Sequence, residues 1–146
     1  VHTRIRGEQM INSYNITDQI LDVNETITFS NNRVLTGCTV THAEGTGTFR
    51  LNKPGYYYVA FNGDGSTLGT AGDVSIQLYN ADTLVPGALA SGYSAAAGNA
   101  VNLSFSTIIK VTPSCCCSDG VASITLKNIG VEATLNNANL TITKLC

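Results

Sequence analysis

Residues 48–64 read TFRLNKPGYYYVAFNGD and hold the most regular pattern in the chain. Tyr57, Val59 and Phe61 recur at alternate positions, which is the period of a β-strand, because successive side chains of a strand point to opposite faces. The opposite face is also largely apolar and is formed by Tyr56, Tyr58 and Ala60. A strand at the surface of a monomeric sandwich carries polar residues on one side. We therefore expect both faces of this strand to be covered.

The residues around this strand predict how it is entered and left. Residues 52–55, NKPG, predict a turn, because Pro54 has a fixed φ and Gly55 a permissive one. Residues 49–51 alternate before that turn, so the sequence predicts a hairpin that joins them to the Tyr57 strand. Residues 62–73 are polar and rich in glycine, which predicts a loop without a strand, and residues 84–87, LVPG, predict another turn.

The rest of the chain also favours strands. Alternation of apolar and polar residues recurs in residues 73–79, 101–111, 122–127 and 139–145, and β-branched residues dominate these runs. Glycine and proline interrupt the sequence too often for a helix. We expect an all-β fold with an N-terminal arm at residues 1–10 and a single domain at residues 11–146, because 146 residues suffice for one well-buried core.

The pattern of the opening stretch resembles the second half of the signature of C1q-like domains, which belong to the TNF-like jelly-roll group. The chain matches that signature at Phe49, Gly55, Tyr57 and Phe61. It departs from it at Val59, where the pattern usually has Phe, and at His42, where it has a bulky apolar residue. The order of features over roughly residues 24–145 is similar to bacterial and bacteriophage relatives, such as C-terminal domains of spore-surface collagen-like glycoproteins and trimeric phage virion modules.

This resemblance implies a homotrimeric jelly-roll β-sandwich of about 8–10 antiparallel strands that serves assembly and display. In TNF-like families the strand corresponding to residues 55–61 lies in the inner sheet, whose outer side packs around a threefold axis. The resemblance therefore implies a trimer interface that includes Tyr56, Tyr58 and Ile108.

The composition limits the partners. Only 12% of the residues are charged and the net charge is −2, so the chain has no basic stripe and nucleic acid is not expected as a partner. No run of about 18 apolar residues is present, so we expect no membrane span. A neutral surface of Asn, Ser, Thr and Gly suits an extracellular, particle-bound protein.

Five cysteines are the most distinctive reactive groups. They are candidate cross-linking residues, namely Cys38, Cys115, Cys116, Cys117 and Cys146. Adjacent cysteines cannot form an unstrained disulfide with each other, which favours cross-links to another strand or another subunit. Unpaired thiols in a loop are the alternative. We expect the three consecutive cysteines to lie in a loop at one end of the sandwich, with any covalent role between chains.

Catalytic and metal-binding patterns are sparse. The two histidines have no partner spacing, and the Gly-rich segment Asn62–Ser66 lacks the terminal acidic residue of a calcium loop. The carboxylates are scattered along the chain at Asp18, Asp22, Glu25, Asp64, Asp73 and Asp82. We therefore expect no enzyme, no metal and no cofactor.

Three functional hypotheses remain. The first is a trimeric, surface-exposed component of a bacteriophage virion, such as a decoration, head-fibre or tail-fibre protein, that contacts other virion proteins. The second is a bacterial spore-surface or appendage subunit that contacts other surface-layer proteins and is cross-linked through its cysteines. The third is a carbohydrate- or receptor-binding module that contacts a host-surface glycan through an exposed aromatic residue such as Tyr93.

Overall fold

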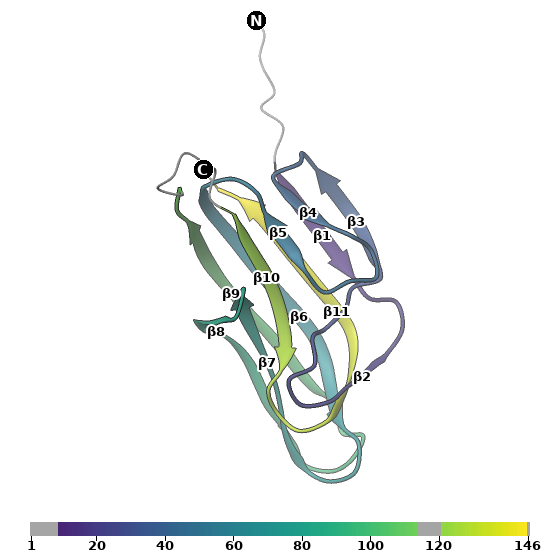
Figure 1. The fold of residues 1–146 in the computed structure, drawn as a ribbon. Coiled ribbons are helices and arrows are strands. Elements are labelled where there is room, and N and C mark those ends of the chain that lie inside the picture. Colours follow the sequence, from purple (N-terminus) through teal and green to yellow (C-terminus); the bar gives the residue numbers. More distant parts are fainter. Residues whose placement is uncertain (1–8, 114–120, 146) are drawn as a thin grey trace, which may run out of the picture.

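The computed structural model describes residues 9–113 and 121–145. These residues form eleven β-strands and no helix (Figure 1). The strands are β1 (Met10–Tyr14), β2 (Gln19–Leu21), β3 (Asn31–Thr36), β4 (Val40–His42), β5 (Phe49–Leu51), β6 (Gly55–Thr67), β7 (Gly72–Asn80), β8 (Thr83–Ser94), β9 (Val101–Val111), β10 (Ala122–Asn128) and β11 (Ala133–Lys144). The number exceeds the expected 8–10 because β2, β4 and β5 are short strands of three residues each.

Two antiparallel sheets form a sandwich, which confirms the predicted all-β class. Sheet A has the strand order β3-β1-β11-β6-β9, with β2 also paired to β11. Sheet B has the order β4-β5-β10-β7-β8. The chain crosses between the sheets repeatedly, so most neighbours within a sheet are distant in sequence. The ends of β1, β6, β9 and β11 that carry Met10, Gly55, Val111 and Lys144 lie at one end of the sandwich.

The core lies between the two sheets and follows the alternation seen in the sequence. Tyr57, Val59 and Phe61 of β6 are buried, as predicted. They are covered from sheet B by the inward side chains of β7 and β10, which are Val74, Ile76, Leu78, Ala122, Ile124 and Leu126. Burial of each large apolar side chain contributes on the order of 1.5–3 kcal/mol, so this face provides much of the driving force for folding.

The predicted hairpin between residues 49–51 and the Tyr57 strand is wrong. β5 belongs to sheet B and pairs with β4 and β10, whereas β6 belongs to sheet A. Residues 52–54 instead carry the chain from one sheet to the other, and the Tyr57 hydroxyl donates a hydrogen bond of 2.6 Å to the Lys53 carbonyl in that turn. The local pattern specifies a turn but does not determine which strands pair on either side of it.

The predicted loop at residues 62–73 is also wrong, because β6 continues to Thr67. Gly63 and Gly65 pair with β9 within the strand and face the core. A Cβ at Gly65 would approach Val74 Cγ1 to 2.8 Å and Leu103 Cδ1 to 3.2 Å, so the absence of a side chain is required for close packing of the sheets.

The turn predicted at residues 84–87 is a β-bulge within β8. The pairing of β8 with β7 shifts register between Gln77 and Tyr79, opposite this segment. Gly87 has a φ of 85°, a left-handed conformation that glycine adopts without a steric penalty. The strand therefore continues through the Val85-Pro86-Gly87 sequence, and residues 88–94 belong to the same edge strand.

Candidate functional site: the exposed face of sheet A

The outward face of sheet A carries the three side chains that the sequence assigned to a subunit interface. Tyr56 and Tyr58 on β6 are 43% and 39% exposed, and Ile108 on β9 is 58% exposed. Tyr58 and Ile108 are directly opposite each other in the β6–β9 ladder, and Tyr56 is opposite Lys110. The structure therefore brings the three predicted residues together on one face.

Two further residues extend this apolar surface, and sequence reasoning missed both. The Leu145 N–H donates to the Tyr56 carbonyl at 2.7 Å, and the Leu145 side chain is 52% exposed. Met10 is paired with Thr143, which is in turn paired with Tyr58. No local pattern connects these positions, because they meet only through the pairing of β1, β11 and β6. We call Met10, Tyr56, Tyr58, Ile108 and Leu145 the apolar surface.

Among the described residues, Lys110 of β9 is a charged neighbour of the apolar surface. Lys110 Nζ lies 5.7 Å from the centre of the Tyr56 ring, which places the cation over the aromatic face. Thr141 and Thr143 on β11, Ala60 on β6 and Ser106 on β9 continue the face as small neutral residues. A surface of this kind loses little by desolvation when it is covered.

The other half of the same face is polar. Asp64 lies within β6, and its carboxylate accepts hydrogen bonds from Asn102 Nδ2 at 3.1 Å and from Asn137 Nδ2 at 3.2 Å. Within the described part of the chain, no group of three or more His, Cys, Asp or Glu side chains is arranged to hold a metal ion. The face is thus divided into an apolar half near residues 56 and 108 and an asparagine-rich half near residue 64.

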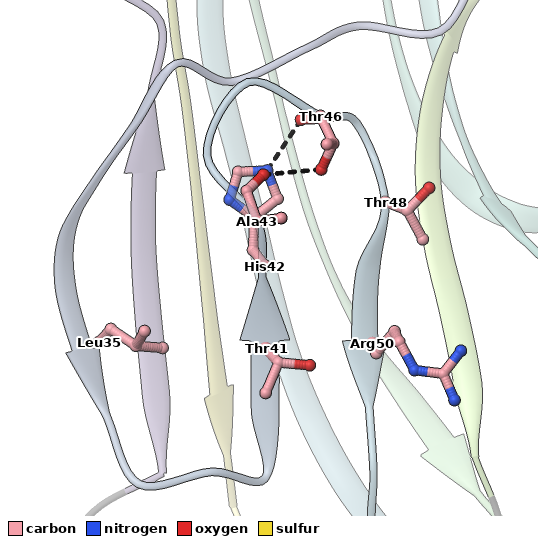
Figure 2. Close-up of a pocket in the computed structure, with 7 residues that line it drawn as sticks. All are labelled: Leu35, Thr41, His42, Ala43, Thr46, Thr48 and Arg50. Atoms are coloured by element: carbon pink, nitrogen blue, oxygen red, sulfur yellow. Dashed lines mark hydrogen bonds between the residues drawn. The ribbon is translucent and has the colours of Figure 1, made fainter.

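A pocket of about 540 Å³ lies on the β4–β5 hairpin beside β3 (Figure 2). Figure 2 shows Leu35, Thr41 and Arg50 among the residues that line it, with His42 next to Ala43 at the end of β4. Arg50 is the only charged side chain among the described residues that line it, and none of these residues carries a carboxylate or a thiol.

The imidazole of His42 has a structural role beside this pocket. It stacks on the Phe49 ring with the ring centres 4.1 Å apart. Nδ1 is 2.7 Å from Asn32 Oδ1 and Nε2 is 2.8 Å from the Thr46 carbonyl. Burial lowers the pKa of His42, and its hydrogen bond to Thr46 and the charge of Glu44 oppose that shift. His42 therefore fills the position of the bulky apolar residue in the C1q-like signature while its polar atoms remain bonded.

Of the five candidate cross-linking residues, only Cys38 lies within the described residues. It is exposed, and it lies between β3 and β4 at the same end of the sandwich as Val111, Lys144 and Ala122. Cys115, Cys116, Cys117 and Cys146 lie outside the described residues.

The acidic residues that are scattered along the sequence also lie mostly apart in the fold. One close contact was not anticipated: Glu132 and Asp22 share a hydrogen bond, which raises the pKa of Glu132. Both carboxyl groups belong to the end of the sandwich away from the apolar surface. Tyr93, the predicted sugar-stacking residue, is 63% exposed on β8. It belongs to sheet B, where it is paired with Asp73 of β7.

Solved structures share this arrangement of two sheets over nearly the whole chain. Murine APRIL, in a crystal structure at pH 5.0, superposes with a TM-score of 0.65 over 94% of this chain and 99% of that chain, at 11% identity. Eiger TNF from S. frugiperda gives 0.65 over 97% and 94%, at 10% identity. The fold is a TNF-like jelly roll.

A protein of a different kind shares the same jelly roll. The vertex protein P5 of PRD1 superposes with a TM-score of 0.55 over 94% of this chain and 96% of that chain, at 13% identity. No protein-family profile matches the sequence, and no curated protein is similar to it in sequence. At these low identities the structural likenesses establish the fold alone. The described residues contain no helix that would cross a membrane.

Proposed function

We propose that this chain is a non-enzymatic assembly module that forms a homotrimer through the outward face of sheet A. The observation that supports this proposal is the exposure of Tyr56, Tyr58 and Ile108 side by side on a sheet with little charge. Exposed adjacent aromatic side chains on a sheet favour association, because covering them removes apolar area from water.

A closed ring of three subunits agrees with the TNF-like jelly roll and with the sequence resemblance. In that arrangement one face of the sandwich meets neighbouring subunits around a single axis, so the assembly closes and does not grow into a fibre. The outer face of sheet B, which includes Arg50, Asp73 and Lys127, then faces solvent.

We further propose that the trimer is exposed on a bacteriophage virion, as a decoration, head-fibre or tail-fibre component. Support comes from the likeness to the PRD1 vertex protein P5, from the resemblance to trimeric phage modules, and from a surface with few charges. A bacterial spore surface or appendage is the second candidate, favoured by the cysteine content, since an exposed Cys38 is available for a cross-link between subunits.

Two measurements test the proposal. Light scattering on the purified chain should give about three times the chain mass of 15.3 kDa, and a monomer at micromolar concentration would contradict the trimer. Gold-labelled antibodies against the protein should decorate purified phage particles. Labelling of spores without labelling of phage particles would contradict the virion and favour the spore surface.

A further inference from the structure

A hollow of about 230 Å³ opens on the asparagine-rich half of the sheet A face. It lies where β1, β3, β6 and β11 run side by side, and the residues that matter for its chemistry are Tyr14, Arg33, Asn62, Asn137 and Asn139. These side chains come from four strands, so the hollow exists only in the folded sheet. It is separated from the apolar surface by several residues along β6.

Two β-bulges border this hollow. In the β1–β3 ladder Asn12 pairs with Val34 and Ser13 pairs with Asn32, so Arg33 is the extra residue. In the β11–β6 ladder the register shifts between Asn136 and Asn139. A bulge redirects the side chains beside it, and bulges are common next to binding sites. Here two separate bulges direct side chains toward one hollow.

The second bulge has a further structural requirement. Asn137 has a φ of 56°, the left-handed conformation that asparagine tolerates better than most residues. A Cβ at the facing Gly63 would lie 3.3 Å from the Asn136 carbonyl oxygen and 3.4 Å from Ala138 Cα. The glycine in β6 therefore allows the bulge in β11 to pack closely on the neighbouring strand.

The hollow presents hydrogen-bonding groups that the described residues leave available. The Arg33 guanidinium carbon lies 4.6 Å from the centre of the Tyr14 ring, and no carboxylate in the described part of the chain pairs with this cation. Asn139 Oδ1 accepts from Asn12 Nδ2 at 2.8 Å, which leaves its own Nδ2 as a donor. Asn137 uses Nδ2 on Asp64, which leaves its Oδ1 as an acceptor.

We propose that this hollow binds one acidic sugar unit, such as a uronic or sialic acid at the end of a glycan. Arginine recognises a carboxylate through paired, charge-assisted hydrogen bonds, and side-chain amides offer both donors and acceptors to sugar hydroxyls. The volume suits a single ring. Tyr93, on the other sheet, contributes nothing to this site.

The charges around the hollow set the orientation of the ligand. Arg33 is on β3 and Asp64 is on β6, which are separated by two intervening strands, roughly 14 Å at the usual strand spacing. The Asp64 carboxylate already accepts two amide hydrogen bonds, from Asn102 and Asn137. The sugar carboxylate therefore lies toward Arg33, and the hydroxyl groups lie toward Asn62 and Asn137.

The test is an NMR titration of the full chain with sialyllactose and, as the neutral probe, lactose. Sialyllactose should shift the side-chain amide signals of Asn62 and Asn139. The variant Arg33→Gln should bind it at least about tenfold more weakly, as expected when a charge-assisted hydrogen bond is lost. Arg50→Gln removes an exposed arginine from the other sheet and should leave the affinity unchanged.

Several results would overturn the proposal. They are an absence of shifts at roughly 10 mM sialyllactose, equal affinity for lactose, and equal binding by Arg33→Gln. Light scattering on Arg33→Gln tests whether the hollow instead contacts a neighbouring subunit. If this variant no longer associates, the hollow receives a group of a neighbouring subunit and not a sugar. The proposal does not rest on the trimer, since a monomer that binds sialyllactose through Arg33 would support the sugar site while contradicting the assembly.

Discussion

Replacement of both exposed tyrosines, Tyr56→Ala and Tyr58→Ala, should dissociate the assembly while leaving the fold intact. The two side chains are 43% and 39% exposed in the single chain. An aromatic residue has about 200 Å² to bury, so association would remove about 80 Å² from water at each tyrosine, worth ~2 kcal/mol at ~25 cal/mol per Å². Loss of both costs ~4 kcal/mol per subunit, which weakens association nearly a thousandfold.

The assay is light scattering over a concentration series, from high nanomolar to high micromolar. The wild-type chain should remain a trimer, and the double variant should be a monomer over most of the range with an unchanged thermal unfolding profile. Tyr93→Ala is the matched control, since it removes an exposed tyrosine from the outward face of the other sheet. A double variant that stays trimeric would refute the assignment of these tyrosines to the interface.

Three further predictions concern single sites. Burial lowers the pKa of His42, so its contribution to stability is present above the unfolded value of about 6.5 and is lost as the pH falls through the folded value. The advantage of wild type over His42→Phe in urea unfolding should thus shrink on acidification, and a constant difference would contradict this. Gly65→Ala should lower stability by about 1–3 kcal/mol because its Cβ would crowd Val74. Gly69→Ala, with nothing within 4 Å of its Cβ, should be nearly neutral, and equal melting temperatures for the two variants would refute the packing argument. Oxidised protein should show inter-chain bands on a non-reducing gel that weaken in Cys38→Ser, whereas monomer bands alone would exclude cross-linking between subunits.

The sequence predicted the two faces of β6 because successive side chains of a strand point to opposite sides. Alternation placed Tyr57 and Val59 on one face and Tyr56 and Tyr58 on the other, and the structure confirms this division. Sheet membership was not predictable in the same way. β6 pairs with β9 and β11, which lie dozens of residues away, and no local signal encodes those pairings.

Glycine was the main source of error. The segment from Asn62 to Ser66 resembles a loop because it is polar and contains two glycines, yet it is the second half of β6. Its glycines face the core at positions where Val74 and Leu103 from other strands approach closely. Tertiary contact overrides local preference there.

The candidate site also contains residues that the sequence predicted and residues that it did not. Tyr56, Tyr58 and Ile108 could be found because alternation gives the face of each strand. Leu145 and the hollow beside Arg33 could not, because they depend on which strands are neighbours and on two bulges. A bulge shifts the register by one or more residues and leaves no reliable mark in the pattern of apolar residues.

The adjacency of the first and last strands has a practical consequence for engineering. The Lys144 N–H donates to the Gln9 carbonyl at 2.9 Å, so residues 9 and 145 lie at one end of the sandwich, whereas residues 68–71 join β6 to β7 at the opposite end (Figure 1). Gly69 has open space around it. A foreign epitope inserted at Gly69 would project away from any tether joined through either end of the domain. A trimer of such chains would present three copies of that epitope in one direction, as a small vaccine scaffold requires.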